Sequence, residues 1–139
     1  MGVYTDSFQI KTKGFCDVVD ITSKAEEAIA KSRLTNGIAL VFIAGSTAGL
    51  TTIEYESGAI SDLKRTIEEL VPQSREYQHN YRWGDGNGFS HIRSALIQTD
   101  LSVPFSGGKL LLGTWQQIVL LDFDNRSRNR KVIVQIIGE

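Results

Sequence analysis

Residues 109–123 read KLLLGTWQQIVLLDF, and residues 131–137 read KVIVQII. Both stretches are rich in apolar and β-branched residues, and the polar segment 124–129 between them is typical of a turn. We therefore predict two long strands joined by this turn. A polar break at residues 113–117 interrupts the first strand. Its Trp and two Gln side chains need hydrogen-bond partners, which either a site wall or a contact between subunits would supply.

The segments before this pair contain both predicted strands and predicted helices. We predict strands over residues 8–11, 15–21, 38–43 and 50–55, because each is apolar or alternates apolar with polar residues. A first helix is expected to start at Ser23, which forms a capping-box pattern with Glu26, and to end at Asn36-Gly37. A second helix starts at Ser57 and stops before Pro72. Its apolar stripe has helical spacing: Ile60, Leu63, Ile67 and Leu70.

The order of these elements predicts the fold class. A short third helix is expected over residues 90–97, before the two long strands. Strands and helices do not alternate regularly, which argues against a parallel sheet of βαβ units. We expect one α+β domain over residues 1–139, mostly antiparallel and sandwich-like. Its strands form either one sheet or two packed sheets, with two to three helices on one side.

Composition excludes several classes of protein. The 139 residues carry 15 Lys and Arg against 16 Asp and Glu, and the one dense basic run, within residues 126–131, is preceded by Asp122 and Asp124. This balance argues against nucleic acid as a partner. The single cysteine, Cys16, permits no disulfide within the chain and is expected to be a packed small residue. No apolar run is long enough for a membrane span, and no signal core is present, so we expect a cytoplasmic protein.

The polar segment 77–91 is the first candidate site. It contains both histidines, His79 and His91, together with Arg82, Asp85 and glycines at alternate positions from residue 84 to 88. Imidazoles bind divalent metals or transfer protons near neutral pH, and glycine-rich backbone can bind an anion. A tight loop that needs positive φ explains the glycines equally well, and the spacing of the histidines matches no standard zinc motif.

The second candidate site is the segment 45–54, which follows the apolar strand 38–43. Ser46 and Thr47 offer hydroxyl donors suited to a phosphate, and Glu54 ends the segment. A turn leading into a threonine-rich edge strand is the alternative. No Walker A lysine and no dinucleotide fingerprint occur in the chain, which disfavours nucleotide binding of those types.

Taken together, these motifs resemble the YjbQ-like family, described as secondary thiamine-phosphate synthase enzymes. The resemblance covers nearly the whole chain. It depends most on Gly-Thr-Trp-Gln-Gln at residues 113–117 and Asn-Gly-Phe-Ser-His at residues 87–91. It implies a small mixed α+β fold, a homotrimer with sites near subunit boundaries, and weak thiamine-phosphate synthase activity. Many members carry His where Gly45 stands, and related members carry His where Phe89 stands. His79 and His91 remain as ligands for a divalent ion, zinc or magnesium.

The resemblance implies a transferase that joins a pyrimidine pyrophosphate to a thiazole phosphate. Backbone of residues 84–88, Arg82 and Lys109 would contact the pyrophosphate, Ser46 and Thr47 the second phosphate, and Trp115 the cationic carbon. The alternatives are a metal- or phosphometabolite-binding protein without turnover and a metal-dependent phosphoester hydrolase. The candidate site residues are His79, His91, Glu54 and Asp85 for catalysis, His79 and His91 for metal, and Ser46, Thr47, Arg82, Gly86, Asn87, Gly88, Lys109, Trp115 and Gln116 for binding.

Overall fold

The apolar segment before the last turn forms the central strand of a small sheet. The structure is a computed structural model that describes all 139 residues. Strand β7 (Gln117–Asp122) lies between β2 (Asp17–Asp20) and β4 (Ala48–Ile53), and both pairings are antiparallel. Ile118 and Leu120 point into one hydrophobic cluster, whereas Val119 and Leu121 point into another. Because both faces of β7 are buried, its sequence is a continuous apolar run rather than an alternating one.

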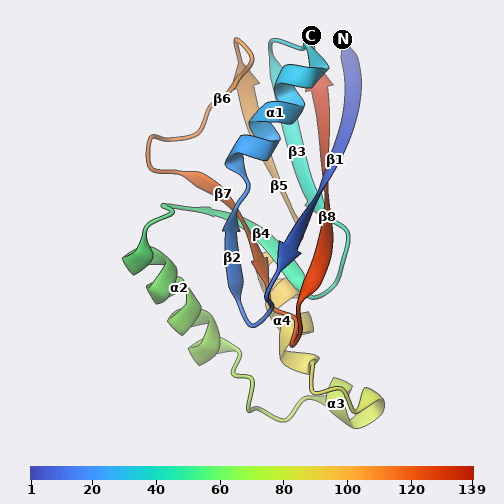
Figure 1. Cartoon of the computed structure of the whole chain (residues 1–139), viewed down its shortest axis with the longest axis vertical. Helices are drawn as coiled ribbons and strands as arrows, with labels where there is room; N and C mark the ends of the chain where they lie inside the picture. The colour runs from blue at the N-terminus through green and yellow to red at the C-terminus, as the bar shows by residue number, and fades with distance from the viewer.

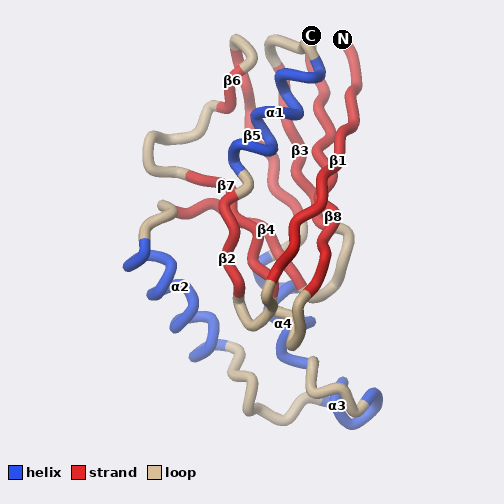
Figure 2. The backbone as a smooth tube through the Cα atoms, in the orientation of Figure 1, coloured by secondary structure: helices blue, strands red, loops and turns tan.

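A larger antiparallel sheet packs against this small sheet (Figure 1, Figure 2). Its strands follow the order β1-β8-β3-β5-β6. Their bounds are β1 (Gly2–Thr12), β8 (Arg128–Gly138), β3 (Gly37–Ile43), β5 (Asp100–Ser106) and β6 (Lys109–Leu110). Alternate residues of β8 face inward, so Val132, Val134 and Ile136 are completely buried. The predicted α+β fold with antiparallel, sandwich-like sheets is confirmed.

Two helices contribute side chains to the two hydrophobic clusters. Helix α1 (Thr22–Ser32) packs Ala25, Ala28 and Ile29 into the main cluster between the two sheets. Helix α2 (Ser57–Leu70) packs Ile67 against the other face of the small sheet, beside Phe123. The small sheet is therefore the middle layer, and the outer face of the large sheet carries no helix.

Several boundaries differ from the prediction. The strand expected over residues 109–123 is two strands, β6 and β7, separated by a loop at residues 111–116. Strand β5 was not predicted, because Pro104 argues against a central strand; here it pairs with Ile38 close to the edge of the sheet. The capping box at Ser23 is wrong: α1 already starts at Thr22, whose N–H donates to Asp20 (3.0 Å).

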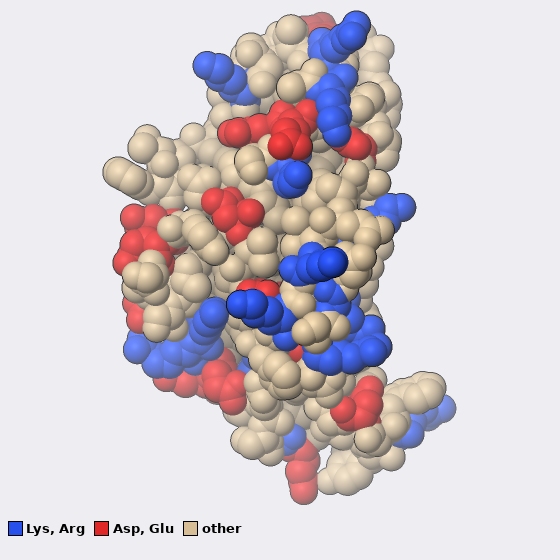
Figure 3. Space-filling view, viewed as in Figure 1, with Lys and Arg blue, Asp and Glu red and all other residues tan.

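The remaining helices, α3 (Gln78–Trp83) and α4 (Gly88–Ile97), lie at one end of the molecule. Strand β6 and both termini lie at the opposite end (Figure 1). Acidic and basic side chains are both spread over the face shown in Figure 3, as the net charge of −1 leads one to expect. None of the helices combines the length and apolarity that a bilayer span requires.

Candidate functional site

The two histidines meet at the junction of α3 and α4. The junction is tight because the Gly88 N–H donates to Asn80 Oδ1 (2.8 Å), and a Cβ on Gly88 would lie only 2.5 Å from Tyr77 Cβ. This packing folds α3 back toward α4. The imidazole rings of His79 and His91 consequently lie with their centroids 4.4 Å apart and their planes tilted by 38°.

The two imidazoles have different electrostatic surroundings. His79 Nδ1 is buried and lies 3.3 Å from Asp85 Oδ1, without the geometry of a hydrogen bond. Burial lowers the pKa of His91 below its ordinary value, and the adjacent His79 lowers it further; the charges of Asp85 and Asp124 and the nearby backbone of Ser46 oppose this shift without cancelling it. His91 is therefore a neutral imidazole near pH 7, able to donate one N–H and to accept one proton.

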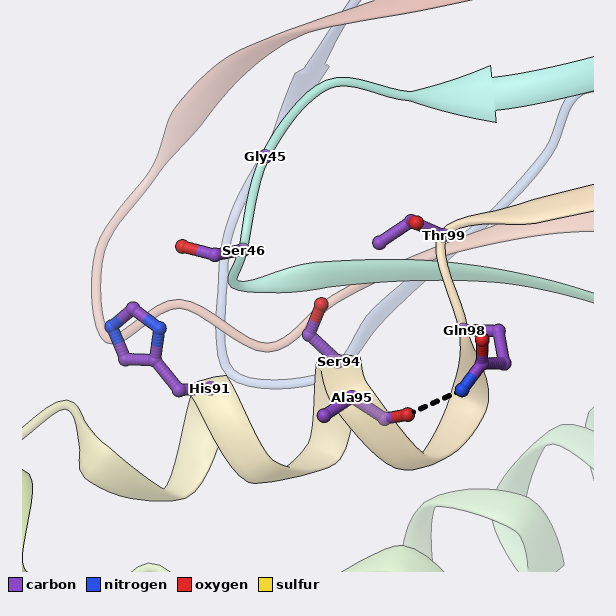
Figure 4. A pocket seen from close by; sticks show the side chains of 7 residues that line it. All are labelled: Gly45, Ser46, His91, Ser94, Ala95, Gln98 and Thr99. Atoms are coloured by element: carbon purple, nitrogen blue, oxygen red, sulfur yellow. Dashed lines mark hydrogen bonds between the residues drawn. The ribbon is translucent and has the colours of Figure 1, made fainter.

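His91 also borders a cavity of about 420 Å³ between α4 and the turn that joins β3 to β4. In Figure 4, the Ser46 side chain and the His91 ring lie at one end of this cavity, and Gln98 and Thr99 lie at the other. Ser94 Oγ donates to the backbone oxygen of Ala48 (2.5 Å) and so fixes α4 against β4. The full lining is Gly45, Ser46, His91, Ser94, Ala95, Gln98 and Thr99.

A buried network of charged residues lies next to this turn. Asp122 accepts from Arg130 Nε (2.7 Å) and Nη2 (2.8 Å), which is a bidentate pair. Thr47 Oγ1 accepts from Arg130 Nη2 (2.6 Å) and donates to Asp124 Oδ2 (2.9 Å). Arg128 Nε also donates to Asp124 Oδ2 (3.0 Å). The network ties β8 and the end of β7 to the turn that carries Ser46.

Within this network Asp124 is ionised and incompletely paired. Its burial opposes ionisation, but the hydrogen bonds from Thr47 and Arg128 outweigh that cost and hold the pKa of Asp124 below its ordinary value. Its second oxygen, Oδ1, is buried and has no hydrogen-bond partner. Such orphaned atoms are uncommon in native proteins and are enriched where function requires them.

The structure therefore brings four of the predicted site residues to one end of the molecule. His79, His91 and Asp85 form one group, and Ser46 lines the cavity together with His91. Thr47 lies directly behind the cavity, because its hydroxyl is buried in the network.

Two backbone N–H groups of the glycine-rich loop are not free for the anion nest that the sequence suggested. Asn87 N–H donates to Asp85 Oδ1 (3.1 Å) and Gly88 N–H donates to Asn80 Oδ1, so both groups are already satisfied within the chain. Asn87 Oδ1 in turn accepts from Ser90 Oγ (2.7 Å). Gly86 has a φ of +64° and open space around it, as a turn glycine does. The tight-loop interpretation accounts for these residues.

Five predicted residues do not line the cavity that His91 borders. Glu54 and Trp115 border a separate hollow of about 480 Å³, and Gln116 donates to Thr52 Oγ1 (3.1 Å) beside another groove. Lys109 belongs to β6, at the end of the molecule opposite α3 and α4 (Figure 1). Arg82 is exposed on α3 and does not line the cavity. The spacing of these five residues along the chain does not predict where they lie in the folded structure.

The two departures from the family pattern have different consequences. Gly45 borders the cavity, so an imidazole at this position would enter it. Phe89 is buried against Val71 and Tyr77 in a small separate cluster. Its side chain does not line the cavity, so of these two positions only 45 borders it.

The side chains of one chain do not fit a metal centre. No group of three His, Cys, Asp or Glu residues lies close enough to hold one ion. The imidazole pair supplies two ligands, whereas zinc sites take three or four from the protein. We therefore derive no chemical step through a metal.

Three site residues were missed at the level of sequence: Asp122, Asp124 and Arg130. They were interpreted as part of a mixed-charge turn. A signal was present, because Arg130 is in phase with the inward-facing Val132 and Val134, and period-two alternation places it on the buried face of β8.

Comparison with known proteins places this geometry in a family. A family model described as "UPF0047 protein YjbQ-like" matches residues 6–139. The chain belongs to this family. A UPF0047 protein of Methanothermobacter thermautotrophicus is 35% identical over 139 residues, which are 100% of this chain and 95% of the relative. One from Archaeoglobus fulgidus is 36% identical over 92% of this chain and 97% of the relative.

Solved structures of this YjbQ-like family share the fold. A YbjQ-like protein of unknown function from Sulfolobus solfataricus matches with a TM-score of 0.94 and 36% identity, over 99% of both chains. A hypothetical protein from Aeropyrum pernix matches with a TM-score of 0.90 and 32% identity, over 97% of this chain and 98% of that one. The family is thus one of unknown function, and any activity must be argued from the site.

Proposed function

We propose that this YjbQ-like chain is an enzyme that acts on phosphorylated small molecules, a transferase resembling secondary thiamine-phosphate synthase. The observation that supports it is the meeting of His91, paired with His79, and Ser46 at one open cavity. A neutral imidazole and a hydroxyl both donate hydrogen bonds to phosphate oxygens.

In the proposed reaction the bond between a pyrimidine methylene carbon and pyrophosphate breaks, and the thiazole nitrogen supplies the electron pair of the new C–N bond. Pyrophosphate departs with the electrons of the broken bond. Donors that strengthen their hydrogen bonds as negative charge develops on the leaving oxygen accelerate such a step. Ser46 Oγ and the His91 N–H are the donors assigned this role, and His79, next to Asp85, orients the His91 ring.

The carbocation that forms needs an electron-rich neighbour, which the lining of the cavity does not contain. Trp115 is 73% exposed and borders a different hollow of the same chain. We therefore include the homotrimer in the proposal, with Trp115 of one subunit completing the cavity of the next. Light scattering coupled to size exclusion measures the mass in solution, and a monomer of 15.4 kDa would remove this part.

The test is to incubate purified protein with the pyrimidine pyrophosphate and the thiazole phosphate, with and without zinc or magnesium. We expect coupled product, reduced roughly 100-fold in His91→Ala, as is typical for loss of one donor to a developing negative charge. Ser61→Ala on the exposed surface of α2 is the matched control for Ser46→Ala. Absence of product above the protein-free background under every metal condition would refute the transferase, and release of inorganic phosphate instead would indicate a phosphoester hydrolase.

Elemental analysis of protein purified without affinity nickel addresses the metal separately. Zinc or magnesium bound in stoichiometric amount, and lost in His79→Ala, would show that assembly or substrate supplies the ligands that one chain lacks.

A further inference from the structure

Arg130 is held rigidly although it carries a full positive charge. It is only 9% exposed, and its inward orientation follows from the alternation of β8. The fork to Asp122 fixes the plane of the guanidinium, and Asp122 is itself held by Thr12 Oγ1 (2.6 Å). An arginine fixed in this way loses little conformational entropy when it binds a further partner.

The hydrogen bonds of Arg130 are incomplete. A guanidinium has five N–H donors. The Nε–H and one Nη2–H donate to Asp122, and a further Nη2–H donates to Thr47. The Nη1 nitrogen donates to no atom of the chain. Nη1 is not among the buried atoms that lack a hydrogen-bond partner, so it reaches solvent and is free to donate to a ligand.

The vacant Nη1 group lies next to Gly45. A Cβ placed on Gly45 would stand 3.1 Å from Nη1, and no other atom lies within 4 Å of that position. Gly45 does not adopt a positive φ, so its backbone conformation does not require glycine. Arg130 does not line the cavity itself; it lies behind Gly45, which lines the cavity with Ser46 and His91, and the missing side chain of Gly45 leaves the position in front of Nη1 open.

The charges of the network determine which ligand fits. Asp122 is paired with Arg130, and Asp124 is paired with Arg128 at 2.9 Å. The unpaired Oδ1 of Asp124 is buried and has no surface that faces a ligand. What the network presents at Gly45 is therefore two N–H donors of a cation, beside a serine hydroxyl and a neutral imidazole. A tetrahedral oxyanion matches this set, because it can accept hydrogen bonds from the Nη1 group of a fixed cation and from the neighbouring hydroxyl and imidazole.

We propose that Arg130 Nη1, Ser46 Oγ and His91 form a phosphate subsite at the Gly45 end of the cavity, which binds the terminal phosphate of a diphosphate ester. This inference rests on the proposed function and adds the cation that holds the substrate. It assigns to Arg130 the contact that the sequence suggested for Arg82 and Lys109, both of which lie away from the cavity.

Binding of inorganic pyrophosphate tests the subsite without catalysis. Titration calorimetry of the wild-type protein is compared with Gly45→Val, which fills the space in front of Nη1 and leaves the pair of Arg130 with Asp122 intact. Gly113→Val, at an exposed loop glycine whose Cβ would meet only ordinary contacts, is the matched control. We expect at least a tenfold rise in Kd for Gly45→Val and an unchanged Kd for Gly113→Val. Equal affinity of Gly45→Val and wild type overturns the proposal.

A direct readout avoids substitution of the buried arginine. In protein labelled with ¹⁵N-arginine, the side-chain resonance of Arg130 is expected to shift on addition of pyrophosphate, while that of Arg65, exposed on α2, stays in place. A stationary Arg130 resonance at saturating pyrophosphate overturns the proposal. If pyrophosphate binds through Arg130 but no coupled product forms, the phosphate subsite stands and the transferase is refuted. If coupled product forms and its yield is unaffected by Gly45→Val, the transferase stands and the subsite is refuted.

Discussion

Replacing Asp122 by Asn is the sharpest test of the buried charge network. The carboxylate is completely buried and accepts four hydrogen bonds, from Thr12, from the Asp124 N–H and from two nitrogens of Arg130. Asn keeps the shape but removes the charge and places a donor against the guanidinium. Removing one partner of a buried ion pair costs roughly 3–5 kcal/mol, because the other charge stays uncompensated. With an unfolding entropy of about 2.1 cal/mol/K for each of the 139 residues, Tm falls by roughly 10–17 °C.

Urea denaturation and calorimetry measure this loss. The control is Asp62→Asn, because Asp62 and its partner Arg65 are both 67% exposed. We expect the control to change the free energy of unfolding by at most about 0.5 kcal/mol. Adding Arg130→Met to Asp122→Asn removes the stranded cation and should restore part of the stability. If Asp122→Asn unfolds at the same urea concentration as Asp62→Asn, the buried network does not stabilise the fold in the way argued.

Three further outcomes follow from the site. In an NMR titration the midpoint of His91 falls below 6.5, and it rises in His79→Asn because the neighbouring positive charge is gone; a midpoint unaffected by that change contradicts the assigned coupling. Because the folded-state pKa of Asp124 lies below 3.8, its contribution to stability is complete above that pH and is lost as the pH falls through the folded pKa. In Asp124→Asn the free energy of unfolding should therefore fall less steeply with decreasing pH than in the wild type. An equal slope at acidic pH would contradict the role assigned to Asp124. Gly88→Ala forces a Cβ to within 2.5 Å of Tyr77 and should separate the two imidazoles, which loss of the nuclear Overhauser contact between their rings would report.

Much of the fold follows from local pattern, and its errors have local causes. The stripe of helix α2 and Pro72 after it give both of its ends correctly. The sequence predicts one strand over residues 109–123, because apolar residues occur on both sides of Gly113. It does not show that the chain leaves the large sheet at this point and enters the small one. Strand β5 was missed because its alternation contains Pro104, which is tolerated here because only the two-residue strand β6 lies beyond β5.

The site was predictable only where chemistry is concentrated in one segment. His79, Asp85 and His91 stand out because they gather within a few residues, and the fold does bring them together with Ser46. Arg130 contacts the same turn from a separate strand, so its role depends on strand order, which a single sequence does not give. Glu54 and Trp115 border a separate hollow of the same chain, because suitable residue types do not fix a direction in space.

The two imidazoles are carried by parts of the molecule that differ in their attachment. Helix α4 is fastened to β4 through the Ser94 hydroxyl, whereas α3 is six residues long and the cluster beside it has only Val71, Tyr77 and Phe89. Segments with so few buried contacts open at far lower cost than sheets do. We therefore expect fraying of this short helix to separate the two tilted imidazoles first, while His91 stays in position at the cavity.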